Sequence, residues 1–175
     1  PYSIGLSINS THSRLVDLGE WTGTPSPPGP DHTIYELHVR DFSIGDRSVP
    51  PEHRGTYLAF THLESVGMTH LARLARAGLT TVHLLPIADF SSVDDVRRED
   101  PGDLGEFPPD SDEQQKRVTA VADEDGFNWG YDPLHWTVPE GSYAVAPDHR
   151  VEEVRAMVDA LHRVGLRVVF DVVYN

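Results

Sequence analysis

Polar and charged side chains, three of them carboxylates capable of acid–base chemistry, follow the apolar runs of this 175-residue sequence. They are Arg40, Asp41, Asp89, Asp171 and Asn175. If the runs are parallel strands of a barrel-type α/β fold, these residues lie at the carboxyl ends of the strands, where such folds place their sites. Neighbouring strands are about 4.8 Å apart, so carboxylates on adjacent strands could act together as acid, base or nucleophile. Taken singly, each has a simpler interpretation as an ion-pair or hydrogen-bond partner, because a buried carboxylate has to be paired.

A second candidate is the aromatic segment between residues 127 and 143. Gly and Pro separate its rings, so we expect a loop rather than a regular element. The rings are Phe127, Trp129, Tyr131, Trp136 and Tyr143. Beside Asn128, Asp132 and His135 they offer flat apolar faces and polar anchors, which suit a sugar ring with apolar C–H faces and hydroxyl edges. The alternative for any one ring is that it packs the loop onto the rest of the fold.

An acidic segment precedes the aromatic one. Residues 94–125 hold twelve acidic and four basic side chains, a net charge of −8 within a whole-chain net charge of −14. We interpret this segment as a solvated face. Calcium binding is the alternative, because oxygen ligands abound although the spaced EF-hand loop is missing. Ser111 followed by Gln114 is a capping-box pattern and predicts a short helix over residues 114–121.

The composition excludes several classes of protein. With 28 acidic and 14 basic side chains, the chain lacks the cationic surplus that binding to nucleic acid or an anionic membrane requires, and we predict neither partner. There is no cysteine, which excludes disulfides, thiolate zinc sites and a cysteine nucleophile. The histidines show no metal-ligand spacing, and no glycine-rich phosphate loop occurs. No apolar run approaches the roughly 20 residues that span a bilayer, so we predict a soluble protein, secreted or cytoplasmic.

The elements that would position the candidate residues alternate along the chain. Apolar strands are expected at residues 34–42, 79–86 and 168–174, and amphipathic helices at residues 68–77 and 151–161. Gly78 and Gly165 follow the two helices, and Asp148 is expected to cap the second. Such strands separated by helices indicate parallel strands buried on both faces. The predicted fold class is therefore α/β, with a long insertion at residues 87–148.

The amino-terminal residues differ from this unit. Residues 1–18 alternate weakly between apolar and polar types, which favours one or two strands of a small β-module. The Pro-rich stretch 24–30 is typical of a linker, because it cannot continue a helix or a central strand. We therefore predict that residues 1–31 are the end of an accessory β-domain with its linker, and that residues 32–175 form the main unit. The sequence begins without Met and stops directly after an expected strand, so we expect it to be part of a longer domain.

Six blocks of the sequence carry a resemblance to known enzymes. They are residues 35–43, 54–61, 83–86, 127–133, 138–144 and 171–175. Together they resemble the pullulanase and limit-dextrinase enzymes of the α-amylase superfamily, and the resemblance extends over the whole chain. The last block is similar to the first signature of the whole superfamily. The block RGTYLAFT at residues 54–61 and the block NWGYDP at residues 128–133 are together more specific to debranching enzymes.

This resemblance implies a fold and an activity. The fold would be the amino-terminal part, about three strands, of a (β/α)8 TIM barrel preceded by the end of a β-sandwich domain. The activity would be retaining hydrolysis of α-1,6-glucosidic linkages in pullulan, limit dextrins or amylopectin. The partner would be an α-glucan, with no cofactor required and calcium left open. The nucleophilic Asp, the acid/base Glu and a second Asp of that group are expected beyond Asn175, so we predict that this chain alone is inactive.

The same resemblance gives roles to five residues. Tyr131 matches the tyrosine that stacks on the sugar in the cleavage subsite. Asp132 and Trp129 are expected to contact the substrate beside it. Asp171 and Asn175 match positions that hold the architecture of the site.

Asp41 and Asp89 match no catalytic position of the group, which argues against a catalytic role for either.

Two alternatives to a debranching enzyme stay open at this point. One alternative is a non-catalytic α-glucan-binding protein, in which the aromatic segment binds glucan and no hydrolysis follows. The other is a different α-amylase-type specificity such as isoamylase, which should lack the block at residues 54–61.

Overall fold

The computed structural model describes residues 2–5, 13–29, 31–90, 92–96, 105–122 and 126–174. Within these ranges the helices are α1 (Val39–Ser43), α2 (Val66–Arg76), α3 (Glu113–Ala120) and α4 (Arg150–Arg163), with short 3-10 helices at η1 (Pro51–His53), η2 (Tyr57–Thr61) and η3 (Pro147–His149). The strands are β1 (Tyr2–Gly5), β2 (Ser13–Val16), β3 (Ile34–Leu37), β4 (Thr81–Leu84), β5 (Ala88–Phe90), β6 (Pro133–Pro139) and β7 (Arg167–Phe170). None of the helices in the described parts of the chain is long and apolar enough to cross a bilayer.

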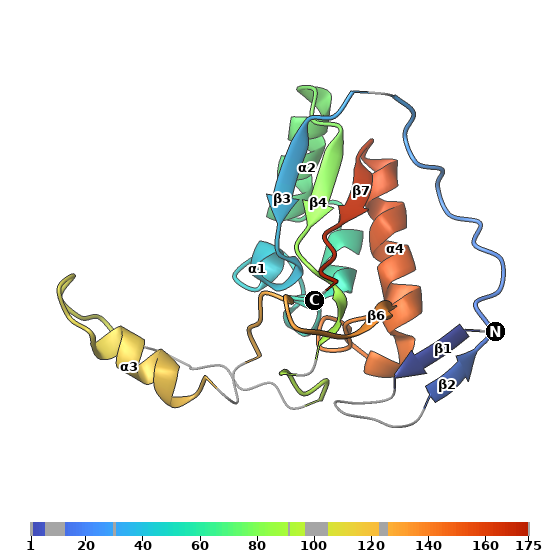
Figure 1. Ribbon diagram of the computed structural model, residues 1–175. Helices are drawn as coiled ribbons and strands as arrows, with labels where there is room; N and C mark the ends of the chain where they lie inside the picture. The colour runs from blue at the N-terminus through green and yellow to red at the C-terminus, as the bar shows by residue number, and fades with distance from the viewer. Residues whose placement is uncertain are drawn as a thin grey trace.

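The centre of the fold is a three-stranded parallel sheet in the order β3–β4–β7 (Figure 1). Its register pairs Tyr35 with Val82, and Val82 in turn with Val168. α2 lies between β3 and β4 in the sequence, and α4 precedes β7, so a helix brings the chain back before each parallel pairing. The predicted α/β class and the order of its strands and helices are confirmed.

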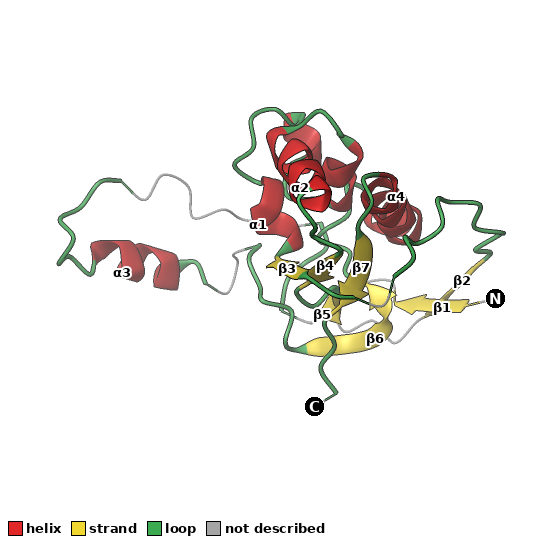
Figure 2. Cartoon of the chain, turned by 90° about the horizontal axis from the view of Figure 1, so that it is seen from above, coloured by secondary structure: helices red, strands yellow, loops and turns green. Residues whose placement is uncertain are grey.

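The hydrophobic core lies between the sheet and two helices. In the view of Figure 2, α2 and α4 lie on one side of the parallel strands, and β5 and β6 lie on the other. The helices and the central strand contribute the buried side chains Met68, Leu71, Val82, Leu84, Met157 and Leu161. The prediction that the parallel strands are buried on both faces holds only for β4, most of which is buried. In the neighbouring strands, Tyr35 of β3 is 38% exposed and Phe170 of β7 is 42% exposed.

All three predicted strands are shorter than expected, and the first also leads directly into an unexpected helix. β3 ends at Leu37, and residues 39–43 form the helix α1 instead of continuing the strand. The reason is local: the imidazole Nδ1 of His38 accepts the backbone N–H of Asp41 and so caps a helical turn. Asp41 therefore lies in a helix. Its Oδ1 lies 3.5 Å from a guanidinium nitrogen of Arg40, so the two neighbouring side chains form an ion pair, the simpler of the interpretations given above.

Two predicted helix caps are also wrong in detail. α3 begins at Glu113, and the hydroxyl of Ser111 accepts the N–H of Glu113 at 3.2 Å rather than that of Gln114. The amide of Gln114 turns to the carbonyl of Gly105, so no reciprocal capping box forms. The cap residue of α4 is His149, one residue after the expected Asp148, which lies in η3.

The described residues 105–122 of the acidic segment project from the fold, whereas Asp95 of the same segment is buried. In both Figure 1 and Figure 2, α3 stands apart from the sheet. Its residues are exposed except for a half-buried Val118, and Lys116 forms ion pairs of 3.0 and 2.9 Å with Asp112 and Glu113. For the described residues 105–122 this agrees with the interpretation of the segment as a solvated face.

The remaining strands form two small antiparallel pairs, β1 with β2 and β5 with β6. The β1–β2 pair agrees with the expected short strands, although the division of the chain at residue 31 stays a prediction. β6 corrects the expectation of a loop throughout residues 127–143, because residues 133–139 pair with β5. The backbone of those residues finds hydrogen-bond partners across the pair, so His135 and Trp136 lie on a strand.

Candidate functional site

The aromatic loop, defined as residues 127–132, lies where the three parallel strands end. His38 follows β3, Pro86 lies two residues after β4, and Asp171 follows β7, and each of these residues contacts the loop. Figure 1 shows the strands pointing toward one edge of the sheet, with β6 at that edge. The loop is therefore held at the side on which α/β folds bind their ligands.

Tyr131 is joined to Asp171 by a side-chain hydrogen bond. The phenol hydroxyl donates to Asp171 Oδ2 at 2.8 Å. This bond to a carboxylate raises the pKa of Tyr131, so the phenol stays protonated and remains a donor. The residue is nevertheless 41% exposed, which leaves an apolar ring surface available for stacking. Asn175, the other predicted architectural residue, lies outside the described residues.

The other two predicted contact residues of the loop are also exposed. Trp129 is 59% exposed, and its ring meets that of Phe127 edge-on with 6.2 Å between centroids. Asp132 Oδ2 accepts the hydroxyl of Ser92 at 2.6 Å. The structure thus exposes all three predicted contact residues on one short loop, while their role in binding stays a prediction.

The backbone of the aromatic loop is folded tightly by Asn128 and Gly130. Asn128 Oδ1 accepts the N–H of Gly130 at 2.7 Å, and its amide donates to the hydroxyl of Ser92. Gly130 has a φ of +81°, and a Cβ at this position would lie 2.6 Å from the carbonyl oxygen of Pro86. Glycine is required there for both conformation and space.

Two buried residues hold the loop from within the fold. His38 Nε2 lies 2.7 Å from the carbonyl oxygen of Asn128, and the hydroxyl of Tyr143 lies 2.9 Å from the same nitrogen. Tyr143 is 1% exposed, so for this ring the packing alternative is correct. Sequence reasoning missed His38. Its place after a strand was not available as a signal, because the sequence predicted a strand over residues 34–42 and only the structure ends it at Leu37.

A buried ion network lies between β5, β6 and the start of α4. The guanidinium of Arg150, 3% exposed, contacts Asp89 Oδ1 at 3.1 Å and Asp95 Oδ2 at 2.5 Å. His135 Nδ1 lies 2.6 Å from Asp89 Oδ2. Burial raises the pKa of Asp89, although His135 and Arg150 act against it. Gly141 is required beside this network, because a Cβ there would lie 2.5 Å from both Arg150 and Asp95. Asp89 is therefore an ion-pair residue, the simpler of its two interpretations.

Glu140 is a fully buried carboxyl directly after β6. Its Oε2 accepts the N–H of Phe90 at 2.9 Å, and its Oε1 accepts the N–H of Ser142 at 2.7 Å. Burial raises the pKa of Glu140 to about 7, against the opposing effect of these two hydrogen bonds. The side chain ties β5 to the turn after β6, a role that the sequence pattern did not indicate.

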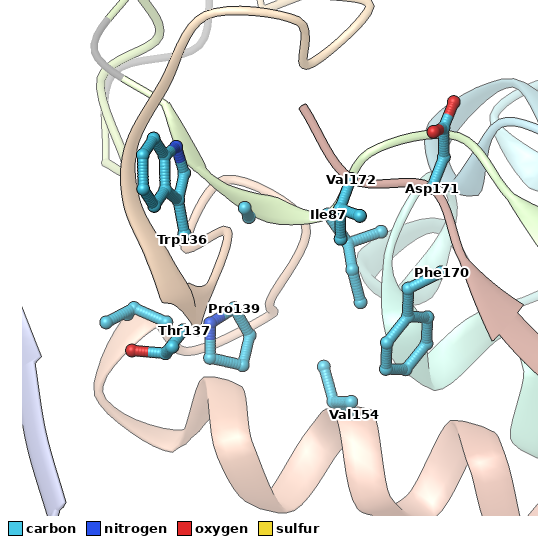
Figure 3. A pocket seen from close by; sticks show the side chains of 10 residues that line it. Ile87, Trp136, Thr137, Pro139, Val154, Phe170, Asp171 and Val172 are labelled. Atoms are coloured by element: carbon cyan, nitrogen blue, oxygen red, sulfur yellow. The ribbon is translucent and has the colours of Figure 1, made fainter. Parts of the chain in front are cut away.

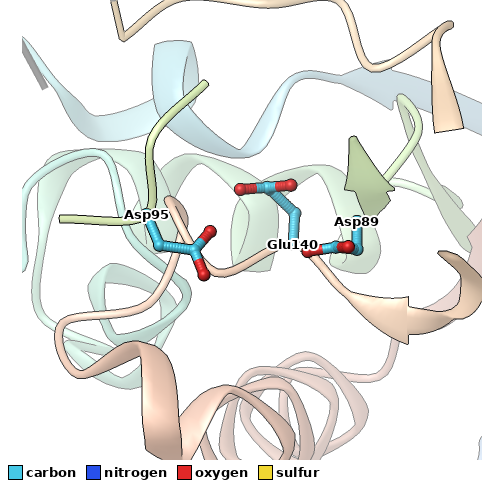
Figure 4. A group of neighbouring side chains, drawn as sticks. All are labelled: Asp89, Asp95 and Glu140. Carbon is cyan, nitrogen blue, oxygen red and sulfur yellow. The ribbon is translucent and has the colours of Figure 1, made fainter. Parts of the chain in front are cut away.

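Among the described residues, one group of three carboxyl side chains lies close enough together to be considered as a metal site. Oxygens of Asp89, Asp95 and Glu140 lie within 4.8 Å of one another (Figure 4). Calcium needs roughly six to eight oxygen ligands. Here Arg150 already binds both aspartates, and both oxygens of Glu140 accept backbone N–H groups. The residues therefore do not fit a calcium ion, and the guanidinium supplies the positive charge instead.

An apolar hollow of about 200 Å³ lies near the loop, between β6, α4 and the end of β7 (Figure 3). Its lining includes Ile87, Trp136, Val154 and Phe170. Figure 3 shows Asp171 at the rim, with its carboxylate pointing away from the apolar walls. The hollow offers packing surface rather than the hydrogen bonds that orient a sugar.

Comparison with known proteins adds relatives over the whole chain. None of the protein-family models matches it. Chloroplastic pullulanase 1 of Arabidopsis thaliana is 46% identical over 195 residues, which cover 100% of this chain and 20% of that protein. The isoamylase of Pseudomonas amyloderamosa is 34% identical over 164 residues, which cover 92% of this chain and 18% of that protein. The chain spans about a fifth of the length of these curated relatives.

A solved structure shares the fold. The crystal structure of Klebsiella pneumoniae pullulanase complexed with maltotriose matches 97% of this chain and 21% of its own chain. The TM-score is 0.86 and the sequence identity is 33%. The similarity therefore extends to sequence as well as fold, over nearly the whole chain.

Proposed function

We propose that this chain, which belongs to the pullulanase family, is part of a glycoside hydrolase. The enzyme would cleave α-1,6-glucosidic linkages in pullulan, limit dextrins or amylopectin with retention. The position of Tyr131 supports this most, since its hydroxyl is bound to Asp171 while its ring is exposed. Aromatic faces of this kind stack on the apolar C–H faces of sugars. The partner is an α-glucan, and the proposal involves neither nucleic acid nor a membrane.

The aromatic loop contributes substrate binding in this proposal. Tyr131 stacks on the sugar in the cleavage subsite, and Trp129 and Asp132 contact the glucan beside it. Asp171 and Asn175 hold the architecture around the tyrosine. Because the loop is hydrogen-bonded to the residues after β3 and β7, little ordering is needed when the sugar arrives, which favours binding.

The parallel sheet is the first part of a (β/α)8 barrel in this proposal. Residues 32–175 supply its first three strands, with the insertion at 87–148. Residues 1–31 are the end of a β-sandwich domain and a linker. The parallel order β3–β4–β7 and the exposed side chains of β3 and β7 support this assignment, because strands of a closed barrel are covered on both faces.

The bond-breaking groups lie outside this chain in the proposal. Retaining glycosidases use a carboxylate nucleophile, which forms a covalent glycosyl-enzyme, and a second carboxyl group as acid and then base. We place both beyond Asn175, so this chain binds and orients the glucan without cleaving it. No cofactor is required. Calcium dependence is tested by assaying activity after dialysis against a chelator.

Reducing ends released from pullulan test this function. They are measured for the 175-residue chain and for a longer protein that carries it. We expect turnover by the longer protein only, and maltotriose binding by both. Tyr131→Ala should weaken binding strongly while leaving it measurable, whereas Trp21→Ala should leave it unchanged, because Trp21 is an exposed aromatic residue stacked on His162 instead of the loop. Turnover by the chain alone would contradict the placement of the catalytic groups.

The two alternatives give different results in the same assays. A non-catalytic α-glucan-binding protein binds maltotriose but releases no reducing ends in any version of the protein. The 34% identity to an isoamylase favours a second enzymatic specificity. The ratio of the rates on pullulan and amylopectin distinguishes that specificity from the pullulanase type.

A further inference from the structure

We propose that His38 is a positioning residue for the aromatic loop and that it acts on glucan binding through Tyr131. The proposal rests on the proposed function, because it assumes that the loop binds an α-glucan. His38 is 7% exposed and lies between β3 and α1, so it is a buried residue of the fold and not one of the exposed loop residues assigned to the substrate.

The partners of the imidazole determine its protonation state. The carbonyl oxygen of Asn128, 2.7 Å from Nε2, can only accept, so Nε2 carries the hydrogen. The backbone N–H of Asp41, 3.3 Å from Nδ1, can only donate, so Nδ1 carries the lone pair. His38 is therefore a neutral imidazole with two separate tasks: Nδ1 caps α1, and Nε2 holds the aromatic loop.

Tyr143 completes the attachment. Its hydroxyl lies 2.9 Å from His38 Nε2 and 3.2 Å from the carbonyl oxygen of Asn128. Because Nε2 carries a single hydrogen, the carbonyl and the hydroxyl share it, and the hydroxyl donates its own hydrogen to the carbonyl. The Asn128 carbonyl thus receives hydrogen bonds from two buried side chains. The ring of Phe127, the preceding loop residue, lies 5.3 Å from the imidazole and adds apolar contact.

The attachment at Asn128 is transmitted to Tyr131 over a short stretch of backbone. The side chain of Asn128 accepts the N–H of Gly130, and Gly130 packs against Pro86. Tyr131 comes next and reaches Asp171. Loss of the His38 hydrogen bond leaves the Asn128 carbonyl with the Tyr143 hydroxyl as its remaining buried donor, so the start of the loop is held less firmly. The tyrosine ring then has to be ordered when the sugar binds, and that ordering weakens the affinity.

Two amide variants separate the tasks of the imidazole. In His38→Asn the side-chain oxygen replaces Nδ1 and can cap α1, but the side chain is too short to reach Asn128. In His38→Gln the amide nitrogen replaces Nε2 and can donate to the Asn128 carbonyl. We expect His38→Asn to bind maltotriose on the order of tenfold more weakly than the wild type, and His38→Gln to restore most of the affinity. Calorimetry gives both affinities, and urea unfolding gives the stability of each variant.

A double-mutant cycle tests the route through Tyr131. In a Tyr131→Ala background, His38→Asn should cause no further loss of affinity while changing stability as it does in the wild type. Losses that add in full would show that His38 acts elsewhere and would overturn the proposal. If His38→Asn does not fold, Tyr143→Phe replaces it in the cycle, because that variant removes one of the two donors to the Asn128 carbonyl and keeps the ring.

The outcomes distinguish this proposal from the proposed function. If the wild type binds maltotriose and Tyr131→Ala weakens that binding strongly, the proposed role of the aromatic loop in glucan binding stands. Under those conditions, a folded His38→Asn variant with wild-type affinity overturns the positioning role alone. If the wild type does not bind maltotriose at all, both proposals fail.

Discussion

The hydroxyl of Tyr131 donates a 2.8 Å hydrogen bond to the carboxylate of Asp171, 40 residues further along the chain. The bond joins a loop of the long insertion to the end of β7. It forms because β7 pairs in parallel with β4, whose own end carries Pro86 against the same loop. The ring of Tyr131 is thereby held at the edge of the sheet without being buried.

Replacing Asp171 should change the ionisation of Tyr131. In Asp171→Asn we expect the pKa of Tyr131 to fall toward its ordinary value of 10, because the carboxylate that accepts the phenol hydrogen is the main cause of the raised pKa. Site-resolved NMR titration of the tyrosine ring measures this. Asp132→Asn is the matched control, since Asp132 bonds to Ser92 instead. An unchanged titration in Asp171→Asn would show that the hydrogen bond is absent in solution.

Gly130→Ala should destabilise the protein and weaken maltotriose binding. The new Cβ would meet the Pro86 carbonyl oxygen at 2.6 Å, at a φ of +81°. We expect a loss of about 1–3 kcal/mol in the free energy of unfolding, measured with urea. Gly19→Ala is the control, because Gly19 has a φ of +55° but no atom within 4 Å of the added Cβ. Equal losses in the two variants would mean that the contact with Pro86 contributes nothing.

Removing the guanidinium of Arg150 should be far more costly than removing an exposed one. Arg150→Ala leaves the buried carboxylates of Asp89 and Asp95 without their cation, and we expect a loss of about 3–5 kcal/mol. Arg163→Ala, on the same helix, breaks an ion pair with Asp159 in which the arginine is 61% exposed, and we expect less than about 1 kcal/mol. Chemical denaturation compares the two. Similar losses would contradict the burial of the network.

Glu140 should make stability depend on pH near neutrality. Its pKa is about 7 in the folded state against an ordinary value of 4.5, so between these values the folded state binds more protons than the unfolded state. The contribution of Glu140 is therefore fully present below pH 4.5 and is lost as the pH rises through 7. The change is on the order of 3 kcal/mol.

Urea unfolding at several pH values measures this effect. In Glu140→Gln the titrating group is absent, and the fall in stability over that range should flatten. Glu152→Gln, which changes an exposed glutamate of α4, should keep the wild-type slope. If Glu140→Gln keeps the wild-type slope as well, another group causes the pH dependence.

The regular elements were predictable where their signal is local. The apolar spacing of α2 and α4, and the glycine after each, indicated both helices, and the runs before and after them indicated parallel strands. The strand at residue 34 was predicted too long because its end depends on one capping contact, between His38 and Asp41. β6 was missed because its strand conformation depends on pairing with β5, more than 40 residues away.

The candidate site divides in the same way. The residue types could be read from the sequence: an aromatic loop carrying Trp129, Tyr131 and Asp132, a carboxylate at the end of a strand, and the resemblance that gave them roles. Which of these groups meet depends on the three-dimensional fold. Pairing of the strands sets Asp171 against Tyr131, and the close fit at Asn128 brings in the buried imidazole of His38. Such contacts depend on distances between elements far apart in the chain, which hydrophobic spacing along the chain does not encode.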